Sequence, residues 1–589
     1  MREPVPEAAH ITNAYLAKIF NDIAAMLELK GDSPFKVRAY RNAATTFANL
    51  HDDIKELWRE GRVDDLPGIG KAITEKVDEL MTTGRLRYYE RLQEEVPPSL
   101  IALMDIPHVG PKTAMLLYQK LGIQGIADLQ KAIEDGRIYS VPGLGPKTVQ
   151  NIKEGIEAIQ RRSAEKRELL GVALPLARQI VQAIRARCPG GLDKIEIAGS
   201  ARRWKPTVGD LDIVATAQDP QAVIDCFVSL PLVDIIDARG ENKATVRLNN
   251  GMQVDLYVLD PQYYYLLLQH FTGSKQHNIK LRDRALKMGY RLSEYGLYRL
   301  SDGQRLPINS EEDIYRALGL RWMPPELRED RGEIEAAERG TLPTLVEMTD
   351  IKGDLQSHST WSDGSKSILE MAQAAKARGY QYLAITDHSQ SLTITNGLSV
   401  ERLHAQRKEI EEAQKAIGDD FRILHGAEVE IKLDGTLDYP DEVLAWLDVV
   451  VASIHSGLRG SAEQVTHRAL AAARNPHVDI IGHPTGRIIG QREPAALDVG
   501  TLIREAARTG VALEINSAPD RLDLDDIYIQ EAMEEGCLLA VNTDAHHPDN
   551  FDFIEYGVHL ARRGWATADR IITTWPLDRL EAWLKSRGQ

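Results

Sequence analysis

The sequence predicts a multidomain protein with an α-helical N-terminal part, an α+β middle part and a C-terminal distorted β/α barrel. Three observations support this. At 589 residues the chain is too long for one hydrophobic core. Residues 11–160 show short amphipathic helical patterns joined by turns with Gly and Pro. β-type runs gather between residues 194 and 259, and from about residue 346 such runs alternate with helical segments, which indicates βα units.

The composition is that of a globular protein without membrane spans. Hydrophobic residues make up 43% and charged residues 27%. No apolar run reaches the roughly 18 residues of a membrane span, and Met1–His10 lacks the basic start and apolar stretch of a signal peptide. The three cysteines, Cys188, Cys226 and Cys537, lie far apart without pairing logic, which predicts a reducing cytoplasm and excludes a cysteine-based zinc site.

The net charge of −16 is unevenly distributed. Residues 1–330 contain as many Lys and Arg as Asp and Glu, so the whole acidic excess lies in residues 331–589. Carboxylates in the C-terminal part could ligate metals, and a neutral N-terminal part can still present a local basic face. The net charge alone therefore excludes neither nucleic-acid binding nor metal binding.

One short pattern occurs three times in the helical part, at residues 66–71, 106–112 and 141–147. Glycines in each turn let backbone N–H groups approach an anion, the following helix N-terminus favours negative charge, and a lysine adds a point charge. This helix-hairpin-helix signature predicts a sequence-independent contact with a DNA phosphate strand, although His108 replaces the first glycine in the middle copy. A single copy could be a packing element, but three copies weigh against that. The predicted contacts are Gly68, Gly70, Lys71, Gly110, Lys112, Gly143, Gly145 and Lys147.

In the middle part, a Gly-Ser segment precedes two aspartates. Asp210 and Asp212 alternate along an expected strand, so both point to one face, and Asp255 on a neighbouring strand would add a third carboxylate. Such a triad can hold two Mg²⁺ ions, one for an attacking 3′-hydroxyl and one for a nucleoside triphosphate. The groups expected at the phosphates are Gly199, Ser200 and Arg203. The alternative is a pair of solvated loop aspartates, and the pattern alone predicts only a nucleotidyltransferase.

Histidines and carboxylates follow the β-type runs of the C-terminal part, where side chains of a βα fold converge on one rim. Imidazole with a bridging carboxylate suits Zn²⁺, Mn²⁺ or Fe²⁺, and such a cluster can activate water against a phosphodiester. A single histidine is more often a core residue, but five of them after apolar runs indicate a metal site. The candidates are His358, Asp363, His388, Glu428, His455, His483, Asp544 and His546.

From about Ile19 to Leu318 the chain resembles the family X DNA polymerases, with lyase, fingers, palm and thumb in order. The resemblance is carried by the aspartate triad and by Phe271-Thr272-Gly273-Ser274, a thumb motif. It implies that the three aspartates bind the catalytic Mg²⁺ ions. Nucleotide-binding roles are implied for Gly199, Ser200, Arg203, Gly273, Ser274, Asn278 and Arg282. His270 stands where the family has a tyrosine that guards against ribonucleotides, and Gln253 replaces an arginine that helps to tune the third aspartate.

The first helical unit resembles the lyase domain of the same family, which binds the 5′-phosphate side of a gap. The resemblance lies in residues 35–41 and the first hairpin. It implies DNA contacts by Lys36, Arg38, Tyr40 and Lys71. Lys76 matches a lysine that forms a Schiff base with the abasic sugar, which requires a depressed pKa. Phe35 and Ala72 depart from the pattern, and the alternative is a plain phosphate-binding or solvated lysine.

The C-terminal part is similar to the polymerase and histidinol phosphatase (PHP) family, which implies a distorted β/α barrel with up to three Zn²⁺ or Mn²⁺ ions. The resemblance assigns metal ligation to the eight candidates named above. The family usually begins with His-x-His, whereas here the first position is Gln356. An amide oxygen is a weaker and harder ligand than imidazole, which predicts a lost or loosened metal or exchange toward Mn²⁺.

Together these features predict a polymerase that fills short gaps in base excision repair and carries a 3′→5′ exonuclease, with AP endonuclease or 3′-phosphatase activity as alternatives for the barrel. The expected partners are gapped or nicked duplex DNA and deoxynucleoside triphosphates, with no membrane, for a monomer in the cytoplasm near the nucleoid. The predicted domains are a lyase-like unit (1–90), fingers (91–165), palm (166–260), thumb (261–323), linker (324–345) and PHP domain (346–589).

Two other functions remain open. One is a DNA-end-binding scaffold with a degenerate PHP domain, which Gln356 favours and the intact aspartate triad disfavours. The other is a template-independent nucleotidyltransferase fused to a small-molecule phosphatase. The three hairpins weigh against it, because a small substrate requires no contact with a duplex.

Overall fold

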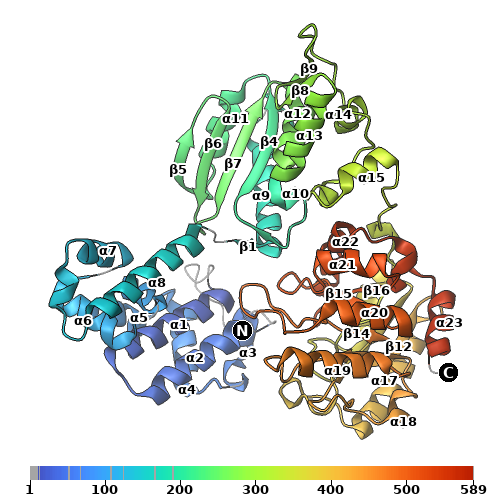
Figure 1. The fold of residues 1–589 in the computed structure, drawn as a ribbon. Coiled ribbons are helices and arrows are strands. Elements are labelled where there is room, and N and C mark those ends of the chain that lie inside the picture. Colours follow the sequence, from blue (N-terminus) through green and yellow to red (C-terminus); the bar gives the residue numbers. More distant parts are fainter. Residues whose placement is uncertain are drawn as a thin grey trace. The chain divides into compact units, whose positions relative to one another are not determined.

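A computed structural model describes residues 11, 13–48, 50, 54–66, 68–106, 109–123, 125–164, 167–188 and 191–587. The chain forms two compact units, Met1–Lys166 and Arg167–Gln589 (Figure 1). Pro67, Pro107 and His108 of the hairpin motifs lie outside the described residues. Within the described ranges, no helix is long and apolar enough to cross a bilayer.

The N-terminal unit is helical throughout its described part. In α1, Leu16, Phe20, Ile23 and Leu27 recur every three or four residues and are buried, so they form one apolar face. The helices α1 and α2 pack along each other through this face. The α-helices are α1 (Asn13–Lys30), α2 (Pro34–Ala48), α3 (Ile54–Glu60), α4 (Lys71–Thr83), α5 (Arg87–Glu95), α6 (Pro111–Leu121), α7 (Ile126–Glu134) and α8 (Pro146–Ala164). The 3₁₀ turns are η2 (Val63–Asp65), η3 (Pro98–Asp105) and η4 (Arg137–Ser140).

The palm is a five-stranded sheet in the order β2-β4-β7-β6-β5. Its strands are β2 (Leu192–Ile197), β4 (Leu211–Ala217), β5 (Val233–Arg239), β6 (Lys243–Leu248) and β7 (Gln253–Leu259). The helices α9 (Leu170–Arg187) and α11 (Pro220–Val228) pack on one face of the sheet. Next to the sheet lie α10 (Gly199–Arg202) and a small ladder of β1 (Glu168–Leu169) and β3 (Thr207–Val208). β4 pairs in parallel with β7, and this register sets Asp212 beside Asp255.

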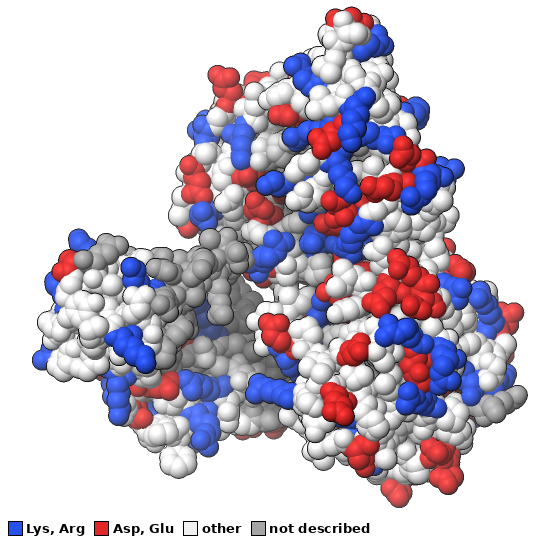
Figure 2. Space-filling view, in the orientation of Figure 1, with Lys and Arg blue, Asp and Glu red and all other residues white. Residues whose placement is uncertain are grey.

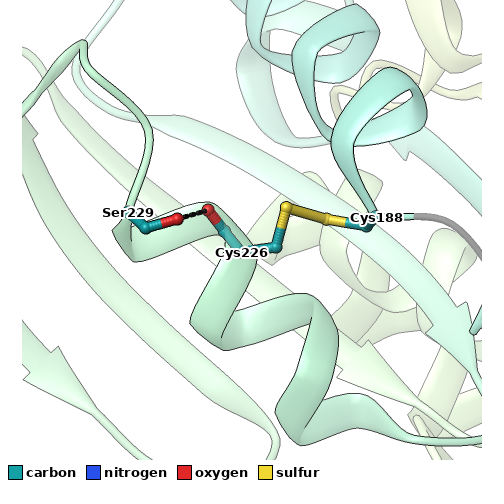
Figure 3. Close-up of a disulfide and its surroundings, with 3 residues drawn as sticks. All are labelled: Cys188, Cys226 and Ser229. Carbon is teal, nitrogen blue, oxygen red and sulfur yellow. Dashed lines mark hydrogen bonds between the residues drawn. A yellow bond between two sulfur atoms is a disulfide. The ribbon is translucent and has the colours of Figure 1, made fainter.

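A disulfide joins α9 to α11, which corrects the expectation that the cysteines do not pair. Cys188 directly follows α9 and Cys226 lies in α11, with their Cα atoms 6.1 Å apart (Figure 3). The 38 residues that separate them in the chain concealed this contact, because it arises only when both helices pack on the same sheet. Cys537 is free and buried. The cysteines therefore give no argument for a reducing compartment.

The thumb follows the palm directly. It comprises η5 (Pro261–Tyr263), α12 (Tyr264–Thr272), α13 (Lys275–Lys287), the hairpin of β8 (Tyr290–Ser293) and β9 (Gly296–Arg299), and α14 (Glu311–Ala317). The segment expected as a polar linker contains η6 (Pro325–Leu327) and α15 (Glu333–Arg339). Three of its charged residues, Glu326, Arg328 and Glu333, are buried rather than solvated. Ion pairs make this possible: Arg328 contacts Glu311 at 2.8 Å and Glu326 contacts Arg562 at 2.7 Å.

The C-terminal domain is a nearly closed barrel of seven parallel strands in sequential order. The strands are β10 (Gly353–Asp354), β11 (Tyr382–Ile385), β12 (Arg422–Glu430), β13 (Val449–Ser453), β14 (Ile480–Ile481), β15 (Ala512–Asn516) and β16 (Leu538–Asn542). His358 N donates to Ala545 O at 2.8 Å, which joins the segments that follow the first and last strands. Side chains alternate along β11: Tyr382 and Ala384 belong to the apolar cluster inside the barrel, while Leu383 and Ile385 belong to the cluster between the strands and the surrounding helices.

Helices surround this barrel. They are α16 (Ile368–Ala377), α17 (Val400–Ile417), α18 (Asp441–Leu444), α19 (Ala462–Arg474), α20 (Val499–Thr509), α21 (Asp526–Glu534), α22 (Ile554–Arg563) and α23 (Leu577–Arg587). The 3₁₀ turns are η7 (Met348–Asp350), η8 (Thr393–Thr395), η9 (Pro548–Phe553), η10 (Ala568–Arg570) and η11 (Ile572–Thr574). The predicted fold class, with helical, α+β and β/α parts in this order, is confirmed.

Candidate active sites

The palm carboxylates predicted from the sequence come together. Asp210, Asp212 and Asp255 each offer an oxygen within 4.8 Å of the others. Asp212 and Asp255 are paired across β4 and β7, and Asp210 directly precedes β4. Gly199 has a φ of +60°, and a Cβ there would lie 2.1 Å from Asp212 Oδ2. Only glycine therefore leaves room beside the triad.

The triad carries uncompensated negative charge. Burial, together with the charges of Asp210 and Asp255, raises the pKa of Asp212 to about 7. Within the described chain, the buried Oδ1 atom of Asp255 has no hydrogen-bond partner. Three close carboxylates, one with an unpartnered oxygen, form the all-oxygen donor set that Mg²⁺ prefers. The residues present therefore fit Mg²⁺.

Lys243 is a palm residue that sequence reasoning missed. Its Nζ donates to Asp255 Oδ2 at 2.9 Å, and although burial opposes the effect, this hydrogen bond raises the pKa of Lys243. The lysine lies at the start of β6, which pairs with β7. Lys243 thus places a cation beside Asp255. The family has an arginine for this purpose at the position that Gln253 occupies here. The cross-strand pairing that brings it there has no local signal in the sequence.

A cavity of about 840 Å³ opens beside the triad. Six of the seven predicted nucleotide-binding residues line it: Gly199, Ser200, Arg203, Gly273, Asn278 and Arg282. Ser274, the seventh, caps α13. Three further cationic residues line the cavity and were missed: Arg167, Lys205 and Lys275. A polar cavity with this many cations beside a carboxylate triad suits a triphosphate held by metal ions.

The thumb residues at the cavity are held firmly. Asn278 donates from Nδ2 to His270 O at 2.7 Å and accepts from Gln269 Nε2 at 2.8 Å. Arg282 Nη2 lies 3.4 Å from His270 Nδ1. His270 therefore lies between two of the predicted nucleotide contacts, at the position where sugar discrimination was in question.

All eight predicted barrel ligands meet in one cluster. Ligand atoms of His358, Asp363, His388 and His546 form one group within 4.8 Å, and Glu428 joins two further groups with His455 and with Asp544. His483 Nε2 lies 2.9 Å from Glu428 Oε1, which completes the set. Every strand except β15 contributes a ligand at or just after its carboxyl end.

The histidines and carboxylates of this cluster shift one another's pKa values. Burial lowers the pKa of His455, but Glu428 and Glu430 together outweigh it and raise this pKa to about 9. Asp363 and Asp544 do the same for His546, whose pKa also rises to about 9. Although burial opposes the effect, the histidines lower the pKa of Asp363 and Asp544 well below their usual range. Metal ions that bind these imidazoles would have to displace their protons.

Unpartnered atoms indicate that this cluster fits metal ions. Among the described residues, the buried Nδ1 atoms of His358 and His483 and the Oε2 atom of Glu428 lack hydrogen-bond partners. His388 Nδ1 lies 3.0 Å from Glu428 Oε2 without hydrogen-bond geometry, as two ligand atoms would. Gln356 is fully buried, and neither atom of its amide finds a partner in the described chain. The donor set suits Zn²⁺ or Mn²⁺, and the amide oxygen of Gln356 is available as a ligand.

Several residues that support the ligands were missed from the sequence. Glu430 Oε2 accepts from His455 Nδ1 at 2.8 Å, and Glu514 Oε2 accepts from His483 N at 2.7 Å. The position of Glu430, two residues after Glu428 on the same face of β12, could have indicated it. Arg521 lies with Nε 3.9 Å from Asp544 Oδ2, and in the described structure its buried Nη1 has no partner. It lies in a loop, where no sequence periodicity marks it.

In the N-terminal unit, Lys76 lies against two aromatic rings. Its Nζ is 4.9 Å from the ring centre of Tyr88 and 5.8 Å from that of Tyr40. Burial lowers the pKa of Lys76, and the charge of Lys36 acts in the same direction. Tyr40, predicted to contact DNA, is only 5% exposed and stacks on Phe20, so its ring belongs to the core. Lys36 pairs with Asp32 at 2.9 Å, and Arg38 is exposed.

The hairpin turns have the geometry that their glycines predict. Gly68 and Gly143 have φ values of +75° and +88°, which favour glycine. Gly70 and Gly110 are the N-caps of α4 and α6, and Gly145 immediately precedes α8. The lysines that follow, Lys71, Lys112 and Lys147, are exposed. The face in Figure 2 shows Lys and Arg interspersed with acidic side chains.

Known families match four parts of the chain. A helix-hairpin-helix domain matches residues 11–86, a SAM-like helix-hairpin-helix tandem 100–158, the DNA polymerase beta thumb 267–329 and the PHP domain 354–518. The chain is 40% identical over 572 residues to the DNA polymerase/3′-5′ exonuclease PolX of Bacillus subtilis (strain 168), which covers 97% of this chain and 99% of that protein.

Two eukaryotic relatives match shorter stretches. DNA polymerase lambda of Rattus norvegicus is 24% identical over 360 residues, which covers 56% of this chain and 58% of that protein. DNA polymerase lambda of Arabidopsis thaliana is 30% identical over 296 residues, which covers 45% and 53%.

The fold and the two clusters define a nucleotidyltransferase joined to a metal-dependent phosphoesterase. The comparisons confirm both resemblances expected from the sequence motifs, to the family X polymerases and to the PHP family. The chain belongs to family X of the DNA polymerases and carries a C-terminal PHP domain.

Proposed function

We propose that this protein is a DNA-directed DNA polymerase that fills short gaps in base excision repair and removes 3′-terminal nucleotides with its barrel. The relative from Bacillus subtilis is named for both activities. The observation that carries the polymerase activity is the convergence of Asp210, Asp212 and Asp255 beside a cationic cavity.

In the palm, the three aspartates would hold two Mg²⁺ ions, which when bound supply charge neutralisation for the primer hydroxyl and the triphosphate. Ser200, Arg203 and Lys275 bind the triphosphate from the cavity wall. Lys243 holds Oδ2 of Asp255, which leaves Oδ1, without a partner among the described residues, available to a Mg²⁺ ion. Gly199 keeps the space beside Asp212 open for the phosphates.

Primer extension on a gapped duplex tests this assignment. We expect Asp255→Ala to abolish nucleotide incorporation. Asp237→Ala is the matched control, because Asp237 is an exposed aspartate of the same sheet that pairs with Arg247. Equal extension by wild type and Asp255→Ala would remove the palm assignment.

In the barrel, the eight ligands would hold up to three Zn²⁺ or Mn²⁺ ions, which when bound activate water and polarise a phosphodiester. Glu430 keeps His455 oriented through its Nδ1, and Glu514 fixes the backbone of His483. Arg521 offers a donor for a phosphate oxygen next to Asp544. This arrangement suits hydrolysis of the last phosphodiester of a strand.

Degradation of a 3′-labelled primer tests the barrel. His388→Ala should abolish 3′ resection and leave synthesis intact. His404→Ala should leave both activities, because His404 is exposed and packs at a tilt against Trp446 outside the cluster. Resection that survives His388→Ala would reject the metal site.

We also propose that Lys76 provides 5′-deoxyribose phosphate lyase activity, supported by its aromatic surroundings and lowered pKa. Borohydride trapping on an incised abasic site should cross-link wild type but not Lys76→Ala. Lys18→Ala is the control, since Lys18 is an exposed lysine paired with Asp22. An undiminished cross-link in Lys76→Ala would show that another amine reacts.

Gapped or nicked duplex DNA is the proposed substrate, and the cytoplasm with its nucleoid the proposed location. We further propose that the protein acts as a monomer, since a single chain supplies all ligands of both clusters. Sedimentation of the full chain on a gapped duplex tests this state directly.

A further inference from the structure

Arg203 is held by residues that lie far from it in the sequence. Its Nε donates to Glu329 Oε1 at 3.0 Å and its Nη1 to Thr272 O at 2.5 Å. Glu329 Oε1 also accepts from Arg563 Nη1 at 3.0 Å. One carboxylate, at the last residue that the thumb family matches, therefore links an arginine of the palm to the last residue of α22 in the barrel domain.

Arg563 makes this link rigid. Its Nη1 also donates to the backbone carbonyl oxygen of Arg203 at 2.6 Å, and its Nη2 donates to Asp526 Oδ2 at 2.5 Å. Arg331 donates to the same Asp526 oxygen at 2.6 Å. Arg563 is 1% exposed and Asp526 5% exposed. Charges buried this deeply are costly without partners, so the hydrogen bonds of Arg563 to Arg203, Glu329 and Asp526 restrict how these groups can be arranged.

The residue after Arg203 is fixed by the same helix. Trp204 has a φ of +55°, a left-handed conformation that is costly for a bulky side chain. Its ring stacks on His559 with 3.7 Å between ring centroids and 4° between planes, and Tyr556 meets it edge-on at 5.9 Å. His559 and Tyr556 both belong to α22. The barrel helix thus stabilises the strained turn that ends the Gly-Ser segment.

We infer that α22 of the PHP domain positions Arg203 for the triphosphate, so that Arg563 and Glu329 are positioning residues of the polymerase. The inference rests on the proposed function, since it requires that Arg203 contacts the triphosphate in the cavity it lines. Nucleotide binding in the palm then depends on a side chain of the other enzymatic domain. Neither residue belongs to the metal cluster of the barrel.

Steady-state gap filling by the full chain tests this dependence. Arg563→Lys keeps the charge but loses the planar fork that contacts Arg203, Glu329 and Asp526 together, and Glu329→Gln keeps the shape but removes the charge that fixes Arg203. We expect KM for the deoxynucleoside triphosphate to rise roughly tenfold in each, as a loss of about 1.4 kcal/mol of binding implies. kcat should change less, and 3′ resection by the same preparations should equal wild type.

Arg178→Gln is the matched control. Arg178 pairs with Glu555 of α22 at 2.6 Å and lies 5.9 Å from the ring centre of Trp204, but no hydrogen bond or ion pair joins it to Arg203 or Glu329 in the described structure. Its replacement disturbs the contact between palm and helix, including the edge of the Trp204 contact, but leaves the hydrogen bonds of Arg203 in place, so its KM should equal wild type. An equal rise in KM for Arg178→Gln would overturn the specific role of Arg563.

A further variant, Arg203→Ala, separates the triphosphate role of Arg203 from its positioning by Arg563 and Glu329. If Arg203→Ala raises KM but Arg563→Lys and Glu329→Gln do not, the inference is overturned and the polymerase assignment stands. If Arg203→Ala leaves KM unchanged, the triphosphate role of Arg203 fails and the inference with it. Should Arg563→Lys not fold, Glu329→Gln decides alone, with its 3′ resection as the measure of an intact barrel.

Discussion

In the palm, three carboxylates from adjacent strands meet on a face that is still partly accessible, whereas in the barrel eight side chains from six strands converge inside a rim. Asp210 and Asp212 are half-buried. In the barrel, His358 is 0% exposed, Glu428 1% and His483 2%. The palm offers oxygen ligands only, whereas the barrel combines nitrogen with oxygen. Both clusters suit divalent cations, but of different hardness and with different access.

The difference extends to charge. In the palm, burial and the charges of Asp210 and Asp255 raise the pKa of Asp212 to about 7, so the three carboxylates repel one another. In the barrel, nearby carboxylates overcome the effect of burial and raise the pKa of His455 and of His546 to about 9. Cations that bind the palm would relieve a repulsion between carboxylates. Cations that bind the barrel would have to displace protons from its imidazoles.

The largest expected effect is the loss of synthesis in the palm while 3′ resection in the barrel is unchanged. Asp212→Asn removes one palm carboxylate and should lower incorporation roughly a thousandfold, as a loss of several kcal/mol of charge stabilisation implies. The 3′ resection should stay at the wild-type level. Both activities are measured on one preparation with a labelled primer. If resection fell in parallel with synthesis, the clusters would not be independent.

Removal of metal with a chelator tests whether the palm and the barrel prefer different cations. After treatment with EDTA, addition of Mg²⁺ alone should restore synthesis but leave 3′ resection about a hundredfold low, because Mg²⁺ is a poor partner for imidazole. Addition of Mn²⁺ should then restore resection. Full recovery of both activities with Mg²⁺ would contradict a nitrogen-containing barrel site.

A substitution at Gln356 should make the metal preference of the barrel differ more strongly from that of the palm. Gln356→His supplies an imidazole where the buried amide has no partner among the described residues. It should tighten Zn²⁺ binding about tenfold, the size of effect seen when ligand surroundings change. Equilibrium titration with a zinc indicator measures this. Gln381→His, an exposed glutamine at the start of β11, controls for an added histidine. Equal binding in both variants would mean that position 356 does not face a metal.

The smallest effect is the pH dependence of the palm. Because the pKa of Asp212 is raised to about 7, the carboxylate is protonated as pH falls, and synthesis at limiting Mg²⁺ should drop roughly twofold between pH 9 and pH 7. More Mg²⁺ should shift the midpoint to lower pH, since the cation competes with the proton. A profile that is flat across this interval at limiting Mg²⁺ would contradict the raised pKa.

Local pattern predicted the palm triad and the eight barrel ligands, because strand alternation and strand ends fix where those side chains point. Residues brought in from elsewhere left no such trace. Lys243 reaches Asp255 across strands, and Arg563 reaches Arg203 over 360 positions of sequence. The Cys188–Cys226 bond likewise depends on helix packing. Segment 324–345 looked solvated because charge is usually exposed, whereas here ion pairs allow Glu326 and Arg328 to be buried.

The stacking of Trp204 on His559 bears on how a nuclease-free version of this enzyme should be prepared. A truncation before residue 346 would leave an indole facing solvent and would remove the guanidinium that Glu329 shares with Arg203. Such a fragment would differ from the intact chain both in solubility and in substrate affinity. Its kinetics could not be attributed to the loss of the nuclease alone. If the proposed role of His388 holds, a single replacement there should abolish the activity of the barrel and preserve the surface that Trp204 packs against.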